Sequence, residues 1–213
     1  IYMVVRRERF PYIKGLLRGF YIPRELFKQF SVKGLPFMVN EFFWAGGMTV
    51  LNIAYSLHGL SVVAGVSISS TVTNLFNIAF MSLGVSIGII AGKLLGADKH
   101  DEAIDTVRKL IAFSFAVSIA VGTAMFLFGG KITAFYKTGE QSKILATYFI
   151  RVSAVISPVF ALTNASFFTL RSGGKTVITM LFDSGVLWGL SSPLAFLLYY
   201  TVHLDIYAVF PII

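Results

Sequence analysis

The chain has 213 residues, of which 56% are hydrophobic and 13% are charged, whereas about 25% charge is typical of soluble domains. This composition excludes an ordinary water-soluble domain and indicates an all-α integral membrane protein, with the lipid bilayer as its partner. The formal net charge of +8 would suit nucleic-acid binding, but the basic residues lie between apolar runs, so we expect no nucleic acid. The absence of cysteine excludes disulfides, thiolate metal sites and a cysteine nucleophile.

Residues 1–33 are predicted to form the end of a preceding helix followed by a basic cytoplasmic linker. Because the first residues are already apolar, we expect the chain to be a piece of a longer protein. Within the linker, residues 24–30 follow Pro23 and have the pattern of a short amphipathic helix on the membrane surface. A flexible solvated linker is the alternative.

Five complete membrane spans are predicted after the linker. Pro36 is expected at the start of the first span, and Pro158 predicts a kink in the fourth. A charged loop is expected at 93–109 and a polar connection at 129–143. The spans are expected at about 35–57, 60–92, 110–128, 144–170 and 177–200, with the start of a last span at 206–213.

The distribution of basic residues predicts the orientation of these spans. Fourteen of the 18 Lys and Arg residues lie in three segments, 6–33, 93–109 and 171–175. Since cytoplasmic loops carry an excess of Lys and Arg, these three segments are predicted to face the cytoplasm. We therefore expect a multi-pass protein of the cell membrane with a cytoplasmic N-terminal linker.

Four glycines recur at every fourth residue, at Gly84, Gly88, Gly92 and Gly96, and thus lie along one face of a helix. Such a face lets another helix approach closely, so packing is the favoured interpretation. A phosphate-binding loop around Lys93 is excluded because Leu94 stands where Ser or Thr is required.

Two carboxylates lie within predicted spans. Glu41 lies six residues into the first span, where an ionised carboxylate costs about 2.5–3.5 kcal/mol, so it must face a cavity, pair with a cation or hold a proton. The alternative is a glutamate near the cytoplasmic interface that water reaches. Asp183 lies near the start of the fifth span and is a second candidate for function. The alternative interpretation is that it is an acid at a helix start, stabilised by the helix dipole.

Several polar residues inside the spans are weaker candidates. Arg151 lies near the outer end of the fourth span, where it can bind substrate or extend to the interface. The amides of Asn74, Asn77 and Asn164 can coordinate an ion, although hydrogen bonds between helices are favoured. The serines and histidines form no convincing catalytic triad or metal site, so we expect no enzyme.

Three segments, at 34–44, 90–103 and 170–176, resemble the multidrug and toxic compound extrusion (MATE) family in the right order. The first, GLPFMVNEFFW, resembles the seventh helix. The second is similar to the glycine-rich end of helix eight and its cytoplasmic loop. The third resembles the turn after helix ten, where the family often has Asp in place of Lys175.

The resemblance implies the C-terminal six-helix lobe of a twelve-helix antiporter that exports drugs or organic cations, coupled to Na⁺ or H⁺ influx. The N-terminal lobe is then a missing partner, and the coupling ion takes the place of a cofactor. Glu41 matches the acid of helix seven used for cation coupling or substrate binding, so it is the candidate site for Na⁺ or H⁺, with Asn40 and Trp44 beside it. The helix-ten carboxylate of some members is absent, and Asp183 is a candidate for a related role.

Two other functions remain open. A lipid-linked oligosaccharide flippase of the same superfamily would need cationic residues in its cavity, and Arg151 is the only central candidate in the sequence. The other is a membrane scaffold or receptor that transports nothing. The carboxylate of Glu41 weighs against this function, because its energetic cost in an apolar run would serve no purpose.

Overall fold

The computed structural model describes residues 22–213, apart from the side chains of Gln29 and Lys33. The helix end and most of the basic linker predicted at the N-terminus lie outside the described residues. The chain divides into two units, Ile1–Val39 and Asn40–Ile213. The packing of the helices over residues 60–172 and the candidate site belong to the second unit.

The first described helix, α2 (Arg24–Ser56), begins directly after Pro23. It includes both the residues predicted as a separate surface helix and those predicted as the first span. The prediction that Pro36 begins a helix is wrong, because Pro36 lies inside α2. Proline removes one backbone donor, and a long helix tolerates that loss when the freed carbonyl finds another partner.

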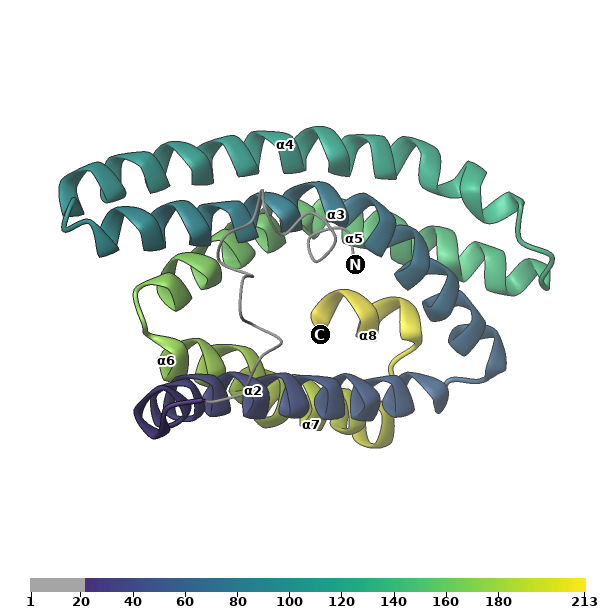
Figure 1. Ribbon diagram of the computed structural model, residues 1–213. Coiled ribbons are helices and arrows are strands. Elements are labelled where there is room, and N and C mark those ends of the chain that lie inside the picture. The colour runs from purple at the N-terminus through teal and green to yellow at the C-terminus, as the bar shows by residue number, and fades with distance from the viewer. Residues whose placement is uncertain (1–21) are drawn as a thin grey trace, which may run out of the picture. The chain divides into compact units, whose positions relative to one another are not determined.

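Three long helices follow and pack against one another: α3 (Leu60–Gly96), α4 (His100–Ala134) and α5 (Glu140–Ser172) (Figure 1). The charged segment predicted as a loop is almost entirely helical, since only residues 97–99 separate α3 from α4. Asp101 and Glu102 favour the start of α4 through the helix dipole, and Asp105 pairs with Lys109 at 2.6 Å. The polar connection likewise shrinks to residues 135–139.

The predicted fifth span is helical over Thr176–Val202 but includes three π-helical stretches. Gly185, Gly189 and Pro193 recur at every fourth residue, and these residue types weaken the regular α-helical pattern. The successive elements are α6 (Thr176–Met180), η2 (Leu181–Gly185), η3 (Leu187–Ser191), α7 (Ser192–Leu197) and η4 (Leu198–Val202). A left-handed residue, His203, then turns the chain into α8 (Ile206–Ile212).

Four helices in the described part of the chain are long and apolar enough to cross a membrane: α3, α4, α5 and Thr176–Val202. The predicted first span, in α2, does not belong to this set, because Asn40, Glu41 and Asn52 lower its hydropathy. Residues 22–213 contain no strand, so the predicted all-α membrane fold is confirmed.

The glycine stripe of α3 packs against α5 as predicted for three of its four members. A Cβ atom built on Gly84 would collide with Asn164, and one on Gly88 would lie 3.3 Å from the carbonyl oxygen of Phe168. A Cβ on Gly92 would lie 3.9 Å from the Cβ of Ser172, but Gly96 faces open space. Since these contacts advance together along both helices, α3 and α5 run parallel.

One close approach of α4 and α5 lies next to Pro158. This proline has no N–H to donate to the carbonyl of Ala154, and the hydroxyl of Ser157 donates to that oxygen at 2.8 Å instead. Gly122 of α4 faces the same oxygen, which a Cβ atom would approach to 2.7 Å. The glycine therefore makes room for the proline-containing segment of α5.

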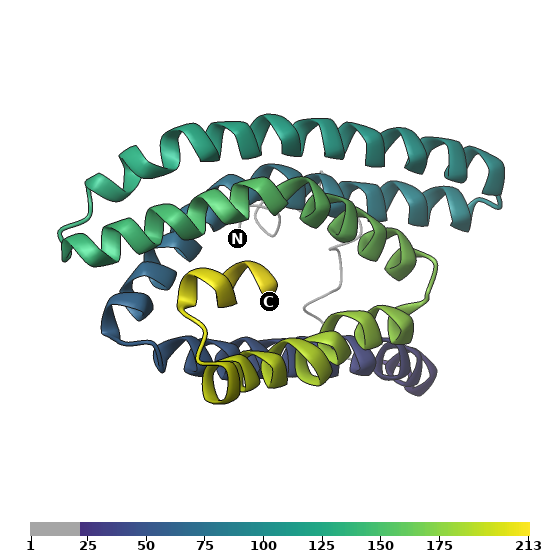
Figure 2. The ribbon, with the colours of Figure 1, turned by 180° about the vertical axis from the view of Figure 1, so that it is seen from behind.

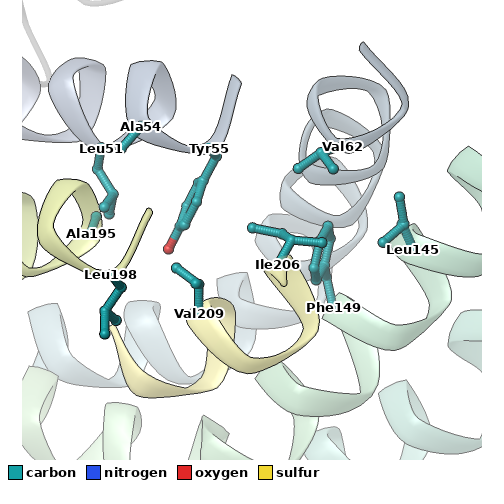
Figure 3. Packing of buried hydrophobic residues seen from close by; sticks show 10 residues of the cluster. All are labelled: Leu51, Ala54, Tyr55, Val62, Leu145, Phe149, Ala195, Leu198, Ile206 and Val209. Atoms are coloured by element: carbon teal, nitrogen blue, oxygen red, sulfur yellow. The ribbon is translucent and has the colours of Figure 1, made fainter. Parts of the chain in front are cut away.

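A cluster of buried apolar residues joins α8 to the rest of the second unit (Figure 3). Figure 2 shows α8 from behind, between the ribbons of α5 and α7. Phe149 of α5 stacks on Phe210 with ring centroids 4.3 Å apart, and Tyr148 donates a hydrogen bond to the carbonyl of Tyr207 at 2.7 Å. This packing fixes α5 at the end that lies away from the site described next.

Candidate functional site

Charged and polar side chains meet where α2, the last turn of α5 and η2 come together. We call Asn40, Glu41, Arg171, Asp183 and Ser184 the carboxylate cluster. Local sequence places two of them: Arg171 is the penultimate residue of α5, and a Gly-Gly turn reverses the chain directly after it. Gly174 adopts a φ of 78°, which glycine tolerates. Asp183 then lies about two turns into the next helix, beside Arg171.

Arg171 lies between two carboxylates. Its Nη2 atom is 3.8 Å from Oε1 of Glu41 and 3.7 Å from Oδ2 of Asp183. The side chains of Arg171 and Asp183 are only 18% and 23% exposed, whereas that of Glu41 is 51% exposed. The cluster thus presents one accessible carboxylate in front of a mostly buried ion pair.

Asn40 of α2 joins the cluster through hydrogen bonds to two residues of η2. It is 2% exposed, and its Nδ2 donates to Oδ2 of Asp183 at 3.2 Å. The hydroxyl of Ser184 donates to Oδ1 of Asn40 at 2.8 Å and lies 3.1 Å from its carbonyl oxygen. A single amide therefore fixes both Asp183 and Ser184 against α2.

The next turns of the two helices continue this contact. Trp188 donates a hydrogen bond from Nε1 to the carbonyl of Phe43 at 2.7 Å. A Cβ atom on Gly47 would lie 2.6 Å from Cδ2 of Leu187, so a larger residue would require the leucine side chain to move. Because the contacts advance together along both helices, α2 and the Thr176–Val202 helix run parallel.

The structure brings three of the predicted site residues, Asn40, Glu41 and Asp183, into the cluster. Trp44 is 43% exposed and lies three residues after Glu41, hence on the same helix face. These four residues form a coherent candidate site for cation binding.

The remaining predicted residues lie elsewhere. Asn74 lines a separate pocket of about 360 Å³ between α2 and α3, together with Asn52 and the hydroxyl-bearing Ser67 and Ser70. Asn77 is buried within α3, and Asn164 packs against Gly84 with a buried Oδ1 atom that makes no hydrogen bond.

Arg151 occupies the opposite part of α5. It lies 20 residues before Arg171, about 30 Å along the helix. Its guanidinium lies 5.5 Å from the ring centroid of Phe126, and it lines a pocket of about 410 Å³ with Lys143 and Glu140. Arg151 therefore does not contribute to the carboxylate cluster.

The sequence did not predict two residues of the cluster, Ser184 and Arg171, and of these only Arg171 is charged. Its sequence position suggested a loop cation that sets the membrane orientation. The available signal was its separation of 12 residues from Asp183 across a tight Gly-Gly turn. Two antiparallel helices joined by so short a turn bring their first and last turns together.

The donor atoms of the cluster are oxygens of carboxylate, amide and hydroxyl groups, which suit hard cations. Residues 22–213 hold no group of three or more His, Cys, Asp and Glu side chains arranged to bind a metal. A cation at this cluster would thus rely on two carboxylates and neutral oxygens, an arrangement that fits a monovalent ion better than a tightly held divalent one.

Comparison with known proteins places this geometry in a family. The family model described as MatE matches residues 36–197, more than half of the chain. The chain belongs to the MatE family. The matched range contains all five residues of the carboxylate cluster, so the site lies within the part of the chain that defines this MatE relationship.

A relative and a solved structure agree with the MatE assignment. The probable multidrug resistance protein YoeA of Bacillus subtilis (strain 168) is 19% identical over 209 residues, covering 98% of this chain and 45% of the relative. The chain thus spans about half the length of this relative. A MOP superfamily transporter from Pyrococcus furiosus Vc1 (DSM3638), described as having a binding pocket of reverse polarity, shares the fold with a TM-score of 0.65 and 19% identity. That match covers 84% of this chain and 40% of the transporter.

Proposed function

We propose that the chain is half of a secondary antiporter that exports drugs or other organic cations, coupled to the influx of Na⁺ or H⁺. The observation that carries this proposal is the accessible carboxylate of Glu41 within a cluster of two acids and one guanidinium. With both acids ionised, these three side chains carry a net charge of −1 (two negative charges and one positive). Such a site attracts a monovalent cation.

Competition for Glu41 would couple the two transported species. We expect that Na⁺ or H⁺ at Glu41 and an organic cation beside Glu41 cannot both be bound favourably. Each would therefore shift the equilibrium between the inward-open and outward-open states in the opposite direction. Exposed aromatic side chains next to Glu41 support the organic-cation part of the proposal. Phe42 is 76% exposed and Trp44 43%, and aromatic faces bind flat cations.

Transport itself requires a second lobe. Alternating access is the rocking of two repeats around a shared site, and the described helices form one of them. We therefore expect residues 1–213 alone to transport nothing, and every transport experiment below uses the full-length protein.

A lipid-linked oligosaccharide flippase is the second candidate, and Arg171 is the observation that favours it, because a buried cation can bind a pyrophosphate. The two carboxylates within 4 Å of Arg171 weigh against this role, since they repel an anion. If flippase activity is found and survives the loss of Arg171, pyrophosphate binding by Arg171 is excluded.

The substitution Glu41→Gln tests the antiporter. We expect it to abolish ion-driven efflux of a fluorescent dye from cells while the membrane level of the protein stays normal. Glu102→Gln is the matched control, because Glu102 is similarly exposed, at 56%, and pairs only on the surface with Lys99. Undiminished efflux with Glu41→Gln contradicts the proposed function.

A further inference from the structure

Two pockets follow one another along a single groove between α4 and α5, which lie side by side in Figure 2. One is the pocket of about 410 Å³ that Arg151 lines, and the other, of about 280 Å³, has mostly apolar walls. Their lining residues recur every three or four positions on both helices, for example Gly122, Phe126 and Gly130 on α4, and Thr147, Arg151 and Ala154 on α5. Both pockets therefore lie on the same face of each helix, and we call them together the α4–α5 groove.

The larger pocket of the groove is positively charged. Lys143 and Arg151 both line it, two turns apart on α5, and the one acid in its lining is Glu140. Glu140 is 81% exposed and lies 3.8 Å from Nζ of Lys143, whereas Arg151 forms no ion pair within residues 22–213. Two positive charges and one negative charge leave a net charge of +1, which attracts an anion.

Arg151 is placed so that it can donate to a phosphate group. Its guanidinium lies over the ring of Phe126, 5.5 Å from the centroid, and this position leaves its N–H groups available for a bidentate contact. The walls around it are fixed by contacts between elements. The hydroxyl oxygens of Thr133 and Thr147 lie 2.8 Å apart across α4 and α5, and Tyr148 donates to a carbonyl of α8. The pocket is thus formed before any ligand binds.

The order of the two pockets matches one leaflet of a bilayer. With 33 residues α5 is ~50 Å long, so when centred it extends about 10 Å beyond a ~30 Å hydrocarbon layer at each end. Arg151 then lies roughly 7 Å inside the hydrocarbon, and its long side chain reaches the headgroup level. Pro158, which lines the apolar pocket, is about 10 Å deeper, at the level of acyl chains.

We propose that the α4–α5 groove binds an anionic phospholipid, with its phosphate at Arg151 and Lys143 and an acyl chain in the apolar pocket beside Phe126. The lipid belongs to the leaflet on the side of the turn at 135–139, which is predicted to be the outer one. Gly122 and Pro158 line the apolar pocket at a close approach of α4 and α5. A chain bound there covers this contact and stabilises it.

Other ligands would use only part of the groove. Inorganic phosphate matches the two cations but has no chain for the apolar pocket. Phosphatidylcholine has chains, but its choline group adds a positive charge next to Arg151 and Lys143. Phosphatidylglycerol supplies the chains and a net negative charge, so we expect it to bind more tightly than either.

The test measures lipid binding to the purified full-length protein in a non-ionic detergent by native mass spectrometry, together with the Tm. Phosphatidylglycerol should bind and raise the Tm, and Arg151→Gln should weaken this binding about tenfold, the lower end of the loss for a hydrogen bond to a charged group. Lys143→Gln should act in the same direction. Lys131→Gln is the matched control, because Lys131 is an exposed cation near the same end of α4 that lines neither pocket.

A second variant tests the apolar pocket. Val155 lines it and is 69% exposed, so a larger side chain there fills the groove without overpacking the core. Val155→Phe should weaken the binding of phosphatidylglycerol with long acyl chains and leave the Tm without lipid unchanged.

Three results would overturn the inference. The first is no difference in phosphatidylglycerol binding among the parent, Arg151→Gln and Lys143→Gln, which includes a parent that retains no lipid. The second is equal binding of phosphatidylcholine and phosphatidylglycerol. The third is inorganic phosphate raising the Tm as much as the lipid does, because that result assigns the pocket to a free anion. Lys143→Gln decides the first comparison if Arg151→Gln does not fold.

The inference is independent of the proposed function, because Arg151 lies about 30 Å along α5 from Arg171 of the carboxylate cluster. Ethidium, an organic cation with one positive charge, should bind Arg151→Gln as it binds the parent. Glu41→Gln should keep the binding of phosphatidylglycerol. Failure of one proposal is therefore distinguishable from failure of the other.

Discussion

At the scale of single residues, Asn40 carries more of the site than its uncharged side chain suggests. It is almost fully buried, and it bonds Asp183 and Ser184 at once. Glu41, its neighbour, points to an accessible position instead. The two adjacent residues thus have different roles: Asn40 fixes the geometry, and Glu41 is the residue that we propose binds the cation.

Replacing Asn40 by alanine should therefore reduce stability. The change removes hydrogen bonds from a buried contact and leaves polar atoms without partners, which costs about 1–3 kcal/mol. Denaturant unfolding of the full-length protein in detergent measures this cost. Asn74→Ala is the control, because Asn74 is exposed in another pocket; equal losses for both variants would contradict the role of Asn40.

The charged members of the cluster could be predicted from sequence only in part. Glu41 and Asp183 are conspicuous because carboxylates are rare within apolar runs. Arg171 is not, since an arginine at the end of a span is explained equally well by membrane orientation. The Gly-Gly turn predicts only that Arg171 lies near Asp183. The packing of α2 that brings Glu41 to Arg171 has no local pattern in the sequence.

At the scale of elements, the contact of α4 with α5 depends on a glycine and a proline together. Pro158 frees the carbonyl of Ala154, Ser157 bonds to that oxygen, and Gly122 leaves space for it. Pro36, by contrast, was expected to begin a helix and lies inside one. Sequence locates such prolines, but whether a helix continues through one depends on the partners of the freed carbonyl.

Gly122→Ala should separate α4 from α5. The added Cβ atom would lie 2.7 Å from a backbone oxygen that cannot rotate away, and overpacking of this kind costs about 1–3 kcal/mol. Gly96→Ala adds the same atom to open space and should be neutral or slightly stabilising. Thermal unfolding of both variants gives the comparison, and a Gly122→Ala protein as stable as Gly96→Ala would refute this account of the helix contact.

Helix ends were less predictable than helix positions. The segment 93–109 is rich in charge and was assigned to a loop, although α3 and α4 extend through nearly all of it. Hydropathy reports which residues suit the bilayer, whereas a helix can continue beyond the bilayer when its charged residues pair with each other.

At the scale of the whole molecule, the helix directions place two of the turns predicted to be cytoplasmic on the same side. The parallel course of α3 and α5 brings Gly92 next to Ser172, so the turns at 97–99 and 173–175 lie at the same ends of these helices. Each turn contains one lysine, Lys99 or Lys175, and both turns lie in segments that are predicted to face the cytoplasm. The turn at 135–139 lies at the other end of α4.

Labelling of single cysteines checks this topology, and the chain contains none of its own. Lys99→Cys should react with an impermeant thiol reagent only from the cytoplasmic side, in inverted vesicles. Lys137→Cys should react only from outside, in intact cells. Labelling of both positions from one side would mean that α4 does not cross the membrane.

The proposed function depends on competition between a coupling cation and an organic cation at Glu41. Its most direct test is a titration of ethidium binding to the purified full-length protein against Na⁺ and against pH. We expect one of the two ions to raise the apparent Kd for ethidium linearly with its concentration, and we expect Glu41→Gln to remove this effect while Glu102→Gln keeps it. Ethidium binding that neither ion displaces, or displacement that persists in Glu41→Gln, would contradict the proposed function.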